Sequence, residues 1–224
     1  MTAIALFVKT PGCSAVKTRL AAGLGRLEAE RLYLRCAGAA AEAAQSAALG
    51  PVYWALAEPV AVAGGFWTGL PLLAQGEGEL GERMGRVHDT LVRKHGRGIL
   101  LGADAPQVSP EDLARAASWL EAEDARIVIG PARDGGFWLF GSNRTLPGQR
   151  WRAVPYSHPR TLAVFREVMA DQGRWLTLRS LTDLDEPADL VSVARELVGL
   201  DSPTPAQSAL AEVLAAAAAS GLER

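Results

Sequence analysis

The stretch GILLGADAPQVS, residues 98–109, is typical of a buried strand that ends at a binding crevice. Its apolar run, Ile99–Leu101, is bounded by glycines, as in the central strands of parallel sheets. In open α/β sheets ligands bind beyond the carboxyl ends of such strands, so we expect Asp104 to face a ligand. An aspartate that only accepts hydrogen bonds from loop amides is an equally good interpretation of this stretch taken alone.

A helix is predicted directly after this loop. Pro106 disfavours helical geometry at the residue before it. Ser109 is a favourable N-cap, Pro110 suits the first helical position, and two acids follow in the first turn. The stretch therefore predicts a strand, a ligand-facing loop and a helix in succession.

Composition restricts the classes of protein that fit. The 224 residues are 49% hydrophobic, which is enough for one sizeable core. The 23 Lys and Arg nearly balance the 25 Asp and Glu, so a duplex nucleic-acid partner is not expected. Cys13 and Cys36 form neither a zinc-ligand pattern nor a disulfide framework, which favours a cytoplasmic location. Glycines and prolines interrupt the apolar stretch 52–74, so no membrane span is expected.

Apolar runs alternate with helical patterns along the rest of the chain. The order strand, helix, strand within the first 56 residues predicts a parallel βαβ unit. His88 and His95, on a helix that ends near residue 94, are expected at the solvated surface. Strands are predicted at 3–8, 52–56, 70–73, 125–129, 137–140 and 175–178, helices at 27–49, 110–121 and 161–172, and irregular structure at 151–156.

A basic loop follows the first predicted strand. The sequence KTPGCSAVKTRLA, residues 9–21, places Lys17 and Arg19 near the start of a helix for which Ser14 can serve as N-cap. Cations at a helix N-terminus oppose the helix dipole, so an anion is expected there, and phosphate is the natural candidate. The loop lacks the second glycine of a Walker A motif. A solvated basic face, with Lys17 as a surface cation, is the alternative.

The stretch GPARDGGFWLFG, residues 130–141, follows another predicted strand. Asp134 offers a carboxylate, and the pair Gly135–Gly136 permits close approach of the backbone to a ligand. A plain hairpin with an Asp-Gly turn is the alternative.

The stretch LTDLDEPADL, residues 181–190, alternates acidic and apolar positions. Asp183 and Asp185 flank Leu184 and would face one way in an extended chain. Two carboxylates on one side can hold a divalent cation. The simpler alternative is that the segment 186–189 forms the start of the next helix.

The order of these motifs resembles that of a known family. A strand followed by KTPGCSAVKTRLA, GELGERM, GADAP, GPARDGGFWL and DLDEPADL is similar to bacterial glycosyltransferase-A-like proteins described as nucleotide-diphospho-sugar transferases. The resemblance spans residues 3–190. It implies a single Rossmann-like αβα sandwich with a mostly parallel sheet, a nucleotide in the N-terminal half and an acceptor in the C-terminal half. Nucleotidyltransferases that act on molybdopterin or phospholactate belong to the same superfamily.

The resemblance also implies roles for individual residues. The diphosphate would be held by the basic loop, through Lys9, Gly12, Lys17, Thr18 and Arg19. The pair Gly135–Gly136 would line the sugar or acceptor site.

The metal and the catalytic groups follow in the same way. Mg²⁺ or Mn²⁺ would be held by Asp104 together with Asp183 or Asp185. Asp104 and Lys17 would be catalytic, and Asp134 is the best candidate for a general base if an acceptor hydroxyl must be deprotonated.

Two departures from the family pattern bear on substrate identity. Relatives often read GSDCP where this chain reads GADAP, so a hydroxyl and a thiol are missing beside Asp104. Residues 155–159 read PYSHP where relatives often carry Trp-Ser-Thr. The second difference leaves the acceptor open.

The expected function is metal-dependent transfer from a nucleotide-activated donor. The partners are a nucleotide or nucleotide sugar and a small-molecule acceptor. Glycosyl transfer is slightly favoured over nucleotidyl transfer to a small phosphorylated acceptor, and a noncatalytic nucleotide-binding module or a purely structural protein is the remaining alternative. Residues 1–200 are expected to form the domain and residues 201–224 a helical tail on it.

Overall fold

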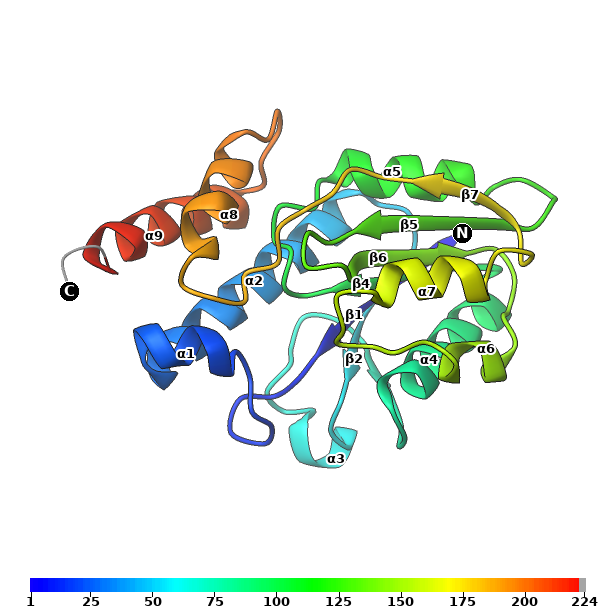
Figure 1. Ribbon diagram of the computed structural model, residues 1–224, viewed down its shortest axis with the longest axis horizontal. Coiled ribbons are helices and arrows are strands. Elements are labelled where there is room, and N and C mark those ends of the chain that lie inside the picture. Colours follow the sequence, from blue (N-terminus) through cyan, green and yellow to red (C-terminus); the bar gives the residue numbers. More distant parts are fainter. Residues whose placement is uncertain (222–224) are drawn as a thin grey trace.

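In the computed structural model, which describes residues 1–221, the strands form a seven-stranded sheet with the order β3-β2-β1-β4-β6-β5-β7 (Figure 1). The strands are β1 (Thr2–Val8), β2 (Val52–Leu56), β3 (Leu72–Ala74), β4 (Arg97–Gly102), β5 (Arg126–Pro131), β6 (Phe137–Ser142) and β7 (Arg174–Thr177). The predicted strands are therefore confirmed, most of them to within two residues.

The sheet is mostly parallel, as expected. Strand β1 pairs in parallel with β2 on one side and with β4 on the other, so the predicted βαβ unit is confirmed. Strand β6 is antiparallel to both β4 and β5. The turn between β5 and β6 is too short for a crossover helix, and an antiparallel return is the geometry that such a turn permits.

Helices cover both faces of the sheet (Figure 1). They are α1 (Thr18–Leu24), α2 (Arg26–Ser46), α3 (Val60–Ala63), α4 (Leu80–His95), α5 (Pro110–Trp119), α6 (Gly148–Arg152), α7 (Thr161–Val168), α8 (Asp189–Val198) and α9 (Pro205–Gly221). Helices α2 and α5 pack on one face, where Ile99 and Leu101 of β4 lie. Helices α4, α6 and α7 pack on the other, with Leu100. This alternation is the two-residue period of a strand buried on both faces.

A third apolar cluster joins α1 and α2 to α8 and α9. Leu210 and Leu214 of α9 are buried against Leu32 and Cys36 of α2 and against the apolar face of α8. Helix α9 thus packs on the same body as the sheet. The last part of the expected tail, residues 222–224, lies outside the described residues. No helix within residues 1–221 is both long and apolar enough to cross a membrane.

Three local expectations were wrong. The helix predicted at 161–172 ends at Val168, and the irregular segment 151–156 begins inside the short helix α6. His88 is not solvated: it is fully buried against the rings of Phe140 and Trp151. Burial lowers the pKa of His88 to about 3, because the uncharged core disfavours the imidazolium form.

Candidate functional site

Three of the predicted site residues follow strands whose ends meet at one edge of the sheet. Lys9 follows β1, Asp104 follows β4, and Asp134 follows β5. Strand β1 has its sequence neighbour β2 on one side and β4 on the other, so the strand order reverses between β1 and β4. Ligands of open α/β sheets bind in the crevice at such a switch point. The topology therefore supports the ligand-facing interpretation of Asp104.

Lys17 is buried between two carboxylates of distant segments. Its Nζ lies 2.7 Å from Oδ1 of Asp104 and 2.8 Å from Oδ1 of Asp185, and only 4% of its side chain is exposed. Burial lowers the pKa of Lys17, but the two negative charges outweigh that effect and raise the pKa above its ordinary value. The alternative of Lys17 as a surface cation is wrong.

The backbone of Lys17 explains how this contact is made. Lys17 is the residue before α1 and has the left-handed conformation, with φ 48° and ψ 45°. The expected N-cap role of Ser14 is therefore wrong, since the helix begins only at Thr18. A non-glycine residue in this conformation costs free energy and is held there by surrounding contacts. Here the two ion pairs of the side chain are such contacts.

Arg19 completes the ion-pair network at the start of α1. Its guanidinium group donates to Oδ2 of Asp185 at 2.9 Å and to Oε1 of Glu186 at 2.8 Å, while remaining largely exposed. The sequence pattern predicted an anion beside these cations, and the anions in the structure are the protein's own carboxylates. Lys17 and Arg19 are consequently already paired before any ligand binds.

The segment 181–185 brings two more carboxylates to the crevice. The amide of Leu184 donates to the carbonyl oxygen of Asp104 at 2.9 Å, which ties the two loops together. Leu184 is fully buried, so Asp183 and Asp185 on either side of it project into the crevice, where both line the same cavity. The predicted alternation is thus present.

Asp183, unlike Asp104 and Asp185, has no ion pair among the described residues. Burial, followed by the charges of Asp104, Asp134 and Asp185, raises its pKa well above the ordinary value. Its Oδ1 is buried and has no hydrogen-bond partner among the described residues. An unpaired buried acceptor is costly in a folded protein and is a common mark of a binding site.

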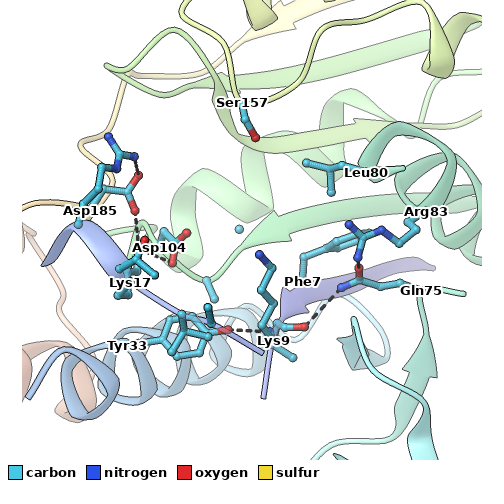
Figure 2. A pocket seen from close by; sticks show the side chains of 17 residues that line it. Phe7, Lys9, Lys17, Tyr33, Gln75, Leu80, Arg83, Asp104, Ser157 and Asp185 are labelled. Carbon is cyan, nitrogen blue, oxygen red and sulfur yellow. Dashed lines mark hydrogen bonds and ion pairs between the residues drawn. The ribbon is translucent and has the colours of Figure 1, made fainter. Parts of the chain in front are cut away.

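A first cavity of about 410 Å³ is lined mainly by residues that precede Asp104 in the chain (Figure 2). Lys9, Lys17, Thr18 and Arg19 of the predicted set line it, and the side chain of Lys9 points into it. The backbone of Lys9 is fixed in place because its amide donates a hydrogen bond to Oη of Tyr33 at 2.8 Å. No ion pair of Lys9 is present among the described residues.

Arg83 also lines this cavity and was not singled out from the sequence. Its Nη1 donates to Oε1 of the buried Gln75 at 3.3 Å, and its buried Nε has no partner in the described part of the chain. Gln75 is itself fixed by a bond from its amide to the carbonyl oxygen of Ala55. The motif GELGERM contains Arg83, but nothing in the sequence distinguishes that arginine from Arg86, three residues further along the same helix.

A second cavity of about 270 Å³ is lined mainly by residues that follow Asp104 in the chain. It shares Asp104, Asp185 and Ser157 with the first cavity, so the two meet at the ion-pair network. Ser157 has φ 56°, a second left-handed residue at the junction. Asp134 and Gly136 line the second cavity, and Oδ1 of Asp134 accepts a hydrogen bond from the Gly136 amide at 2.8 Å. Asp134 therefore takes part in a turn and also lines a cavity.

Two glycines of the predicted set line neither cavity. Gly12 lies in the loop before α1, in open surroundings with φ 87°. Gly135 has φ 92° and packs against the backbone of Pro159, whose carbonyl oxygen a Cβ atom would strike. Its carbonyl oxygen accepts from the amide of Leu162 at 2.8 Å. The physical role of Gly135 is thus to seat the segment that carries Ser157.

The carboxylates fit a divalent cation by chemistry. Carboxylate oxygens are ligands that Mg²⁺ and Mn²⁺ prefer, and Oδ1 of Asp183 is unpartnered. In the arrangement present, however, Nζ of Lys17 lies between Asp104 and Asp185. Within residues 1–221 no group of three or more His, Cys, Asp or Glu side chains is arranged to hold a metal ion. The metal site stays a prediction.

Comparisons with known proteins agree with this fold. The model of a family described as "Uncharacterized protein conserved in bacteria (DUF2064)" matches residues 24–158. No curated protein matches the sequence. A solved structure from Desulfovibrio desulfuricans G20, described as a "putative nucleotide-diphospho-sugar transferase", is 23% identical with a TM-score of 0.83, over 98% of this chain and 97% of that one.

A second solved structure is more distant. It is a nucleotidyl transferase from Methanothermobacter thermautotroptrophicus, 16% identical with a TM-score of 0.59, over 89% of this chain and 99% of that one. At these identities the likeness establishes the fold. The family resemblance inferred from the motifs is confirmed.

Proposed function

The chain belongs to the bacterial family DUF2064. From this premise we propose that it is a metal-dependent transferase that uses a nucleotide-activated donor. The favoured donor is a nucleotide-diphospho-sugar. The observation that carries the proposal is the pair of cavities that meet at Asp104 and Asp185, one lined by lysine and arginine side chains and the other by apolar groups and carboxylates. Transfer between two substrates needs two such spaces with a shared reacting point. The described functions of the two similar structures support the same class.

The donor would occupy the first cavity. Its diphosphate would lie against Lys9 and Arg83, because these cations face the cavity without a carboxylate partner, whereas Lys17 and Arg19 are already paired. Cations free of internal ion pairs bind an anionic ligand without first losing a contact. Lys17 would add positive charge at the junction of the cavities.

The metal would be held by Asp104, Asp183 and Asp185. When bound, Mg²⁺ or Mn²⁺ supplies positive charge that neutralises the donor phosphates and the leaving oxygen. Asp104 and Asp185 share Lys17, whereas Asp183 has no ion pair among the described residues, so a bound cation would favour its ionised form.

The acceptor would enter the second cavity with its hydroxyl near Asp134. In glycosyl transfer the acceptor oxygen forms a bond to the sugar carbon, the bond from that carbon to the diphosphate breaks, and the nucleoside diphosphate leaves. The hydroxyl proton passes to Asp134, whose Oδ1 is already oriented by the Gly136 amide.

A panel of nucleoside diphosphates and nucleotide sugars, each with and without MgCl₂, tests this proposal by thermal shift. Ligand at a hundred times its dissociation constant stabilises by roughly 2.7 kcal/mol, which raises the melting temperature by roughly 5 to 10 °C in a domain of this size. Asp104→Asn should lose the Mg²⁺ enhancement, and Asp185→Asn should lose part of it. No shift with any nucleotide in the presence of metal would contradict the proposal.

The donor assignment needs its own variants. Lys9→Ala and Arg83→Ala should each weaken nucleotide binding, whereas Arg93→Ala, on the exposed side of α4 and away from both cavities, should not. Product analysis with radiolabelled donors then separates the reactions: a glycosyltransferase releases a nucleoside diphosphate, and a nucleotidyltransferase acting on a triphosphate releases pyrophosphate. Binding without turnover over broad acceptor panels would favour a noncatalytic module.

A further inference from the structure

The second cavity differs from the first in the sign of its charged groups. None of the described residues that line it is a lysine or an arginine, and its titratable groups are Tyr156, His158 and the carboxyl groups of Asp104, Asp134, Asp183 and Asp185. Two of these are paired with Lys17, which faces the other cavity. A phosphate or carboxylate group entering this space would lose its hydration and meet Asp134, which has no ion pair among the described residues, while no lysine or arginine lines the wall.

The remaining wall of this cavity is apolar. Phe7, Leu80, Met84, Leu100 and Phe137 contribute side chains to it. Its volume of about 270 Å³ lies just below the usual range for small-molecule sites. The wall thus suits a small molecule with an apolar ring or chain.

Two residues that line this cavity each carry a polar atom without a hydrogen-bond partner within residues 1–221. The two atoms are Oη of Tyr156 and Oδ1 of Asp183, both fully buried. A phenol can donate a hydrogen bond and a carboxylate oxygen can accept one. A hydroxyl group of a ligand, which both accepts and donates, could pair with either of them.

We propose that the second cavity binds an acceptor without negative charge, in which an apolar body rests against Phe7, Met84 and Phe137 and a hydroxyl group lies at the acidic end. The proposal rests on the proposed function in treating this molecule as an acceptor. It selects against the small phosphorylated acceptor that the nucleotidyltransferase alternative requires. The preference for an uncharged acceptor over a phosphorylated one follows from the charge of the lining residues and not from the fold.

Matched probes on one scaffold test the charge rule. Benzyl alcohol, benzylamine and benzyl phosphate are titrated by ligand-observed NMR at pH 7.5 in EDTA, because a metal ion held by Asp104, Asp183 and Asp185 would offset the negative charge that the probes report on. Benzyl alcohol and benzylamine should bind, and benzyl phosphate should bind about tenfold more weakly or worse, because a like charge within a few ångströms in a partly buried site costs at least that factor. Equal or tighter binding of benzyl phosphate, or no binding of the other two at roughly 10 mM, would overturn the proposal.

Two kinds of variant locate the effect. Met84→Trp should fill the cavity and abolish probe binding, while nucleotide binding in the first cavity persists, because Met84 does not line that cavity. The double variant Asp134→Asn, Asp183→Asn should improve the affinity of benzyl phosphate relative to benzyl alcohol by about tenfold. An unchanged ratio would overturn the charge rule even if Met84→Trp failed to fold. If the probes behave as expected and no nucleotide binds, the proposed function fails and the ligand class of this cavity stands.

Discussion

The ammonium group of Lys17 lies 2.7 Å from the carboxylate of Asp104, although the two residues are 87 positions apart in the chain (104 − 17 = 87). One was predicted to bind phosphate and the other a metal ion, and in the structure they bind each other. Any anion that uses Lys17, or any cation that uses Asp104, therefore competes with this ion pair. Ligand binding and local stability at the junction of the cavities are coupled for that reason.

Lys17→Met tests this coupling. The variant keeps much of the side-chain volume but leaves Asp104 and Asp185 facing each other without a cation. We expect a loss of about 2 kcal/mol in the free energy of unfolding, below the 3–5 kcal/mol of fully buried pairs because both carboxylates are partly exposed. Addition of MgCl₂ should restore part of it. Urea unfolding with and without MgCl₂ measures both effects.

Lys9→Met is the matched control for that variant. Lys9 is an exposed lysine of the same cavity with no ion pair among the described residues, so its loss should leave the free energy of unfolding nearly unchanged. Similar losses in the two variants would show that the buried ion pairs of Lys17 do not stabilise the fold.

Asp183→Asn should stabilise the protein at neutral pH. The pKa of Asp183 is raised in the folded state, so the folded protein binds a proton that the unfolded chain has released. This penalty is absent below about pH 4 and grows as the pH rises towards the folded pKa. The urea midpoint of the variant should therefore equal that of the wild type near pH 4 and be higher than it at pH 7. It should also lose Mg²⁺-dependent nucleotide binding, a gain in stability at the expense of function.

Asp124→Asn is the control for the charge effect. Asp124 is exposed, and the hydrogen bond and charge of Arg126 lower its pKa, so this variant should gain no stability as the pH rises. A gain in both variants would point to the net charge of the chain instead of the buried position of Asp183.

His88 should make the fold sensitive to mild acid. Its folded pKa of about 3 lies below the ordinary value of 6.5, so between these values the unfolded chain binds the extra proton. Stability is then complete above pH 6.5 and falls by roughly 1 kcal/mol for each pH unit below it. His88→Phe and His88→Leu should flatten the dependence of the urea midpoint between pH 6.5 and 5. A wild-type slope in both variants would assign the acid sensitivity to other groups.

Gly135→Ala should distort the wall of the second cavity. The new Cβ atom would strike the carbonyl oxygen of Pro159 from a backbone with φ 92°, so the segment that carries Tyr156 and Ser157 must shift. We expect a loss of about 2 kcal/mol in the free energy of unfolding and weaker binding of benzyl alcohol.

Gly136→Ala provides the comparison. At this position the nearest contact is the carboxylate of Asp134, which can move, and φ is not in the left-handed region. Its cost should be below about 1 kcal/mol. Equal losses at the two glycines in urea unfolding would contradict the packing role assigned to Gly135.

The strands, their order in the chain and several of the loops that line the two cavities were readable from the sequence. Burial on a strand repeats every two residues and capping residues lie beside the helices they start, so these signals are local. The run Ile99–Leu101 followed by Asp104, and the alternation around Leu184, are examples in which the pattern and the structure agree. The motif order also identified the family, because it records the spacing of several loops at once.

Only the tertiary structure decided how the charges pair and which cavity each residue faces. Nothing in the basic loop reveals that Lys17 meets Asp104 and Asp185, since these partners come from loops up to 168 residues away. Arg83 of α4 donates to the buried Gln75, which follows β3, and so lines the first cavity, and His88 is buried by rings that the sequence does not bring near it. Electrostatic energies depend on distance and burial, and both are set when the sheet assembles.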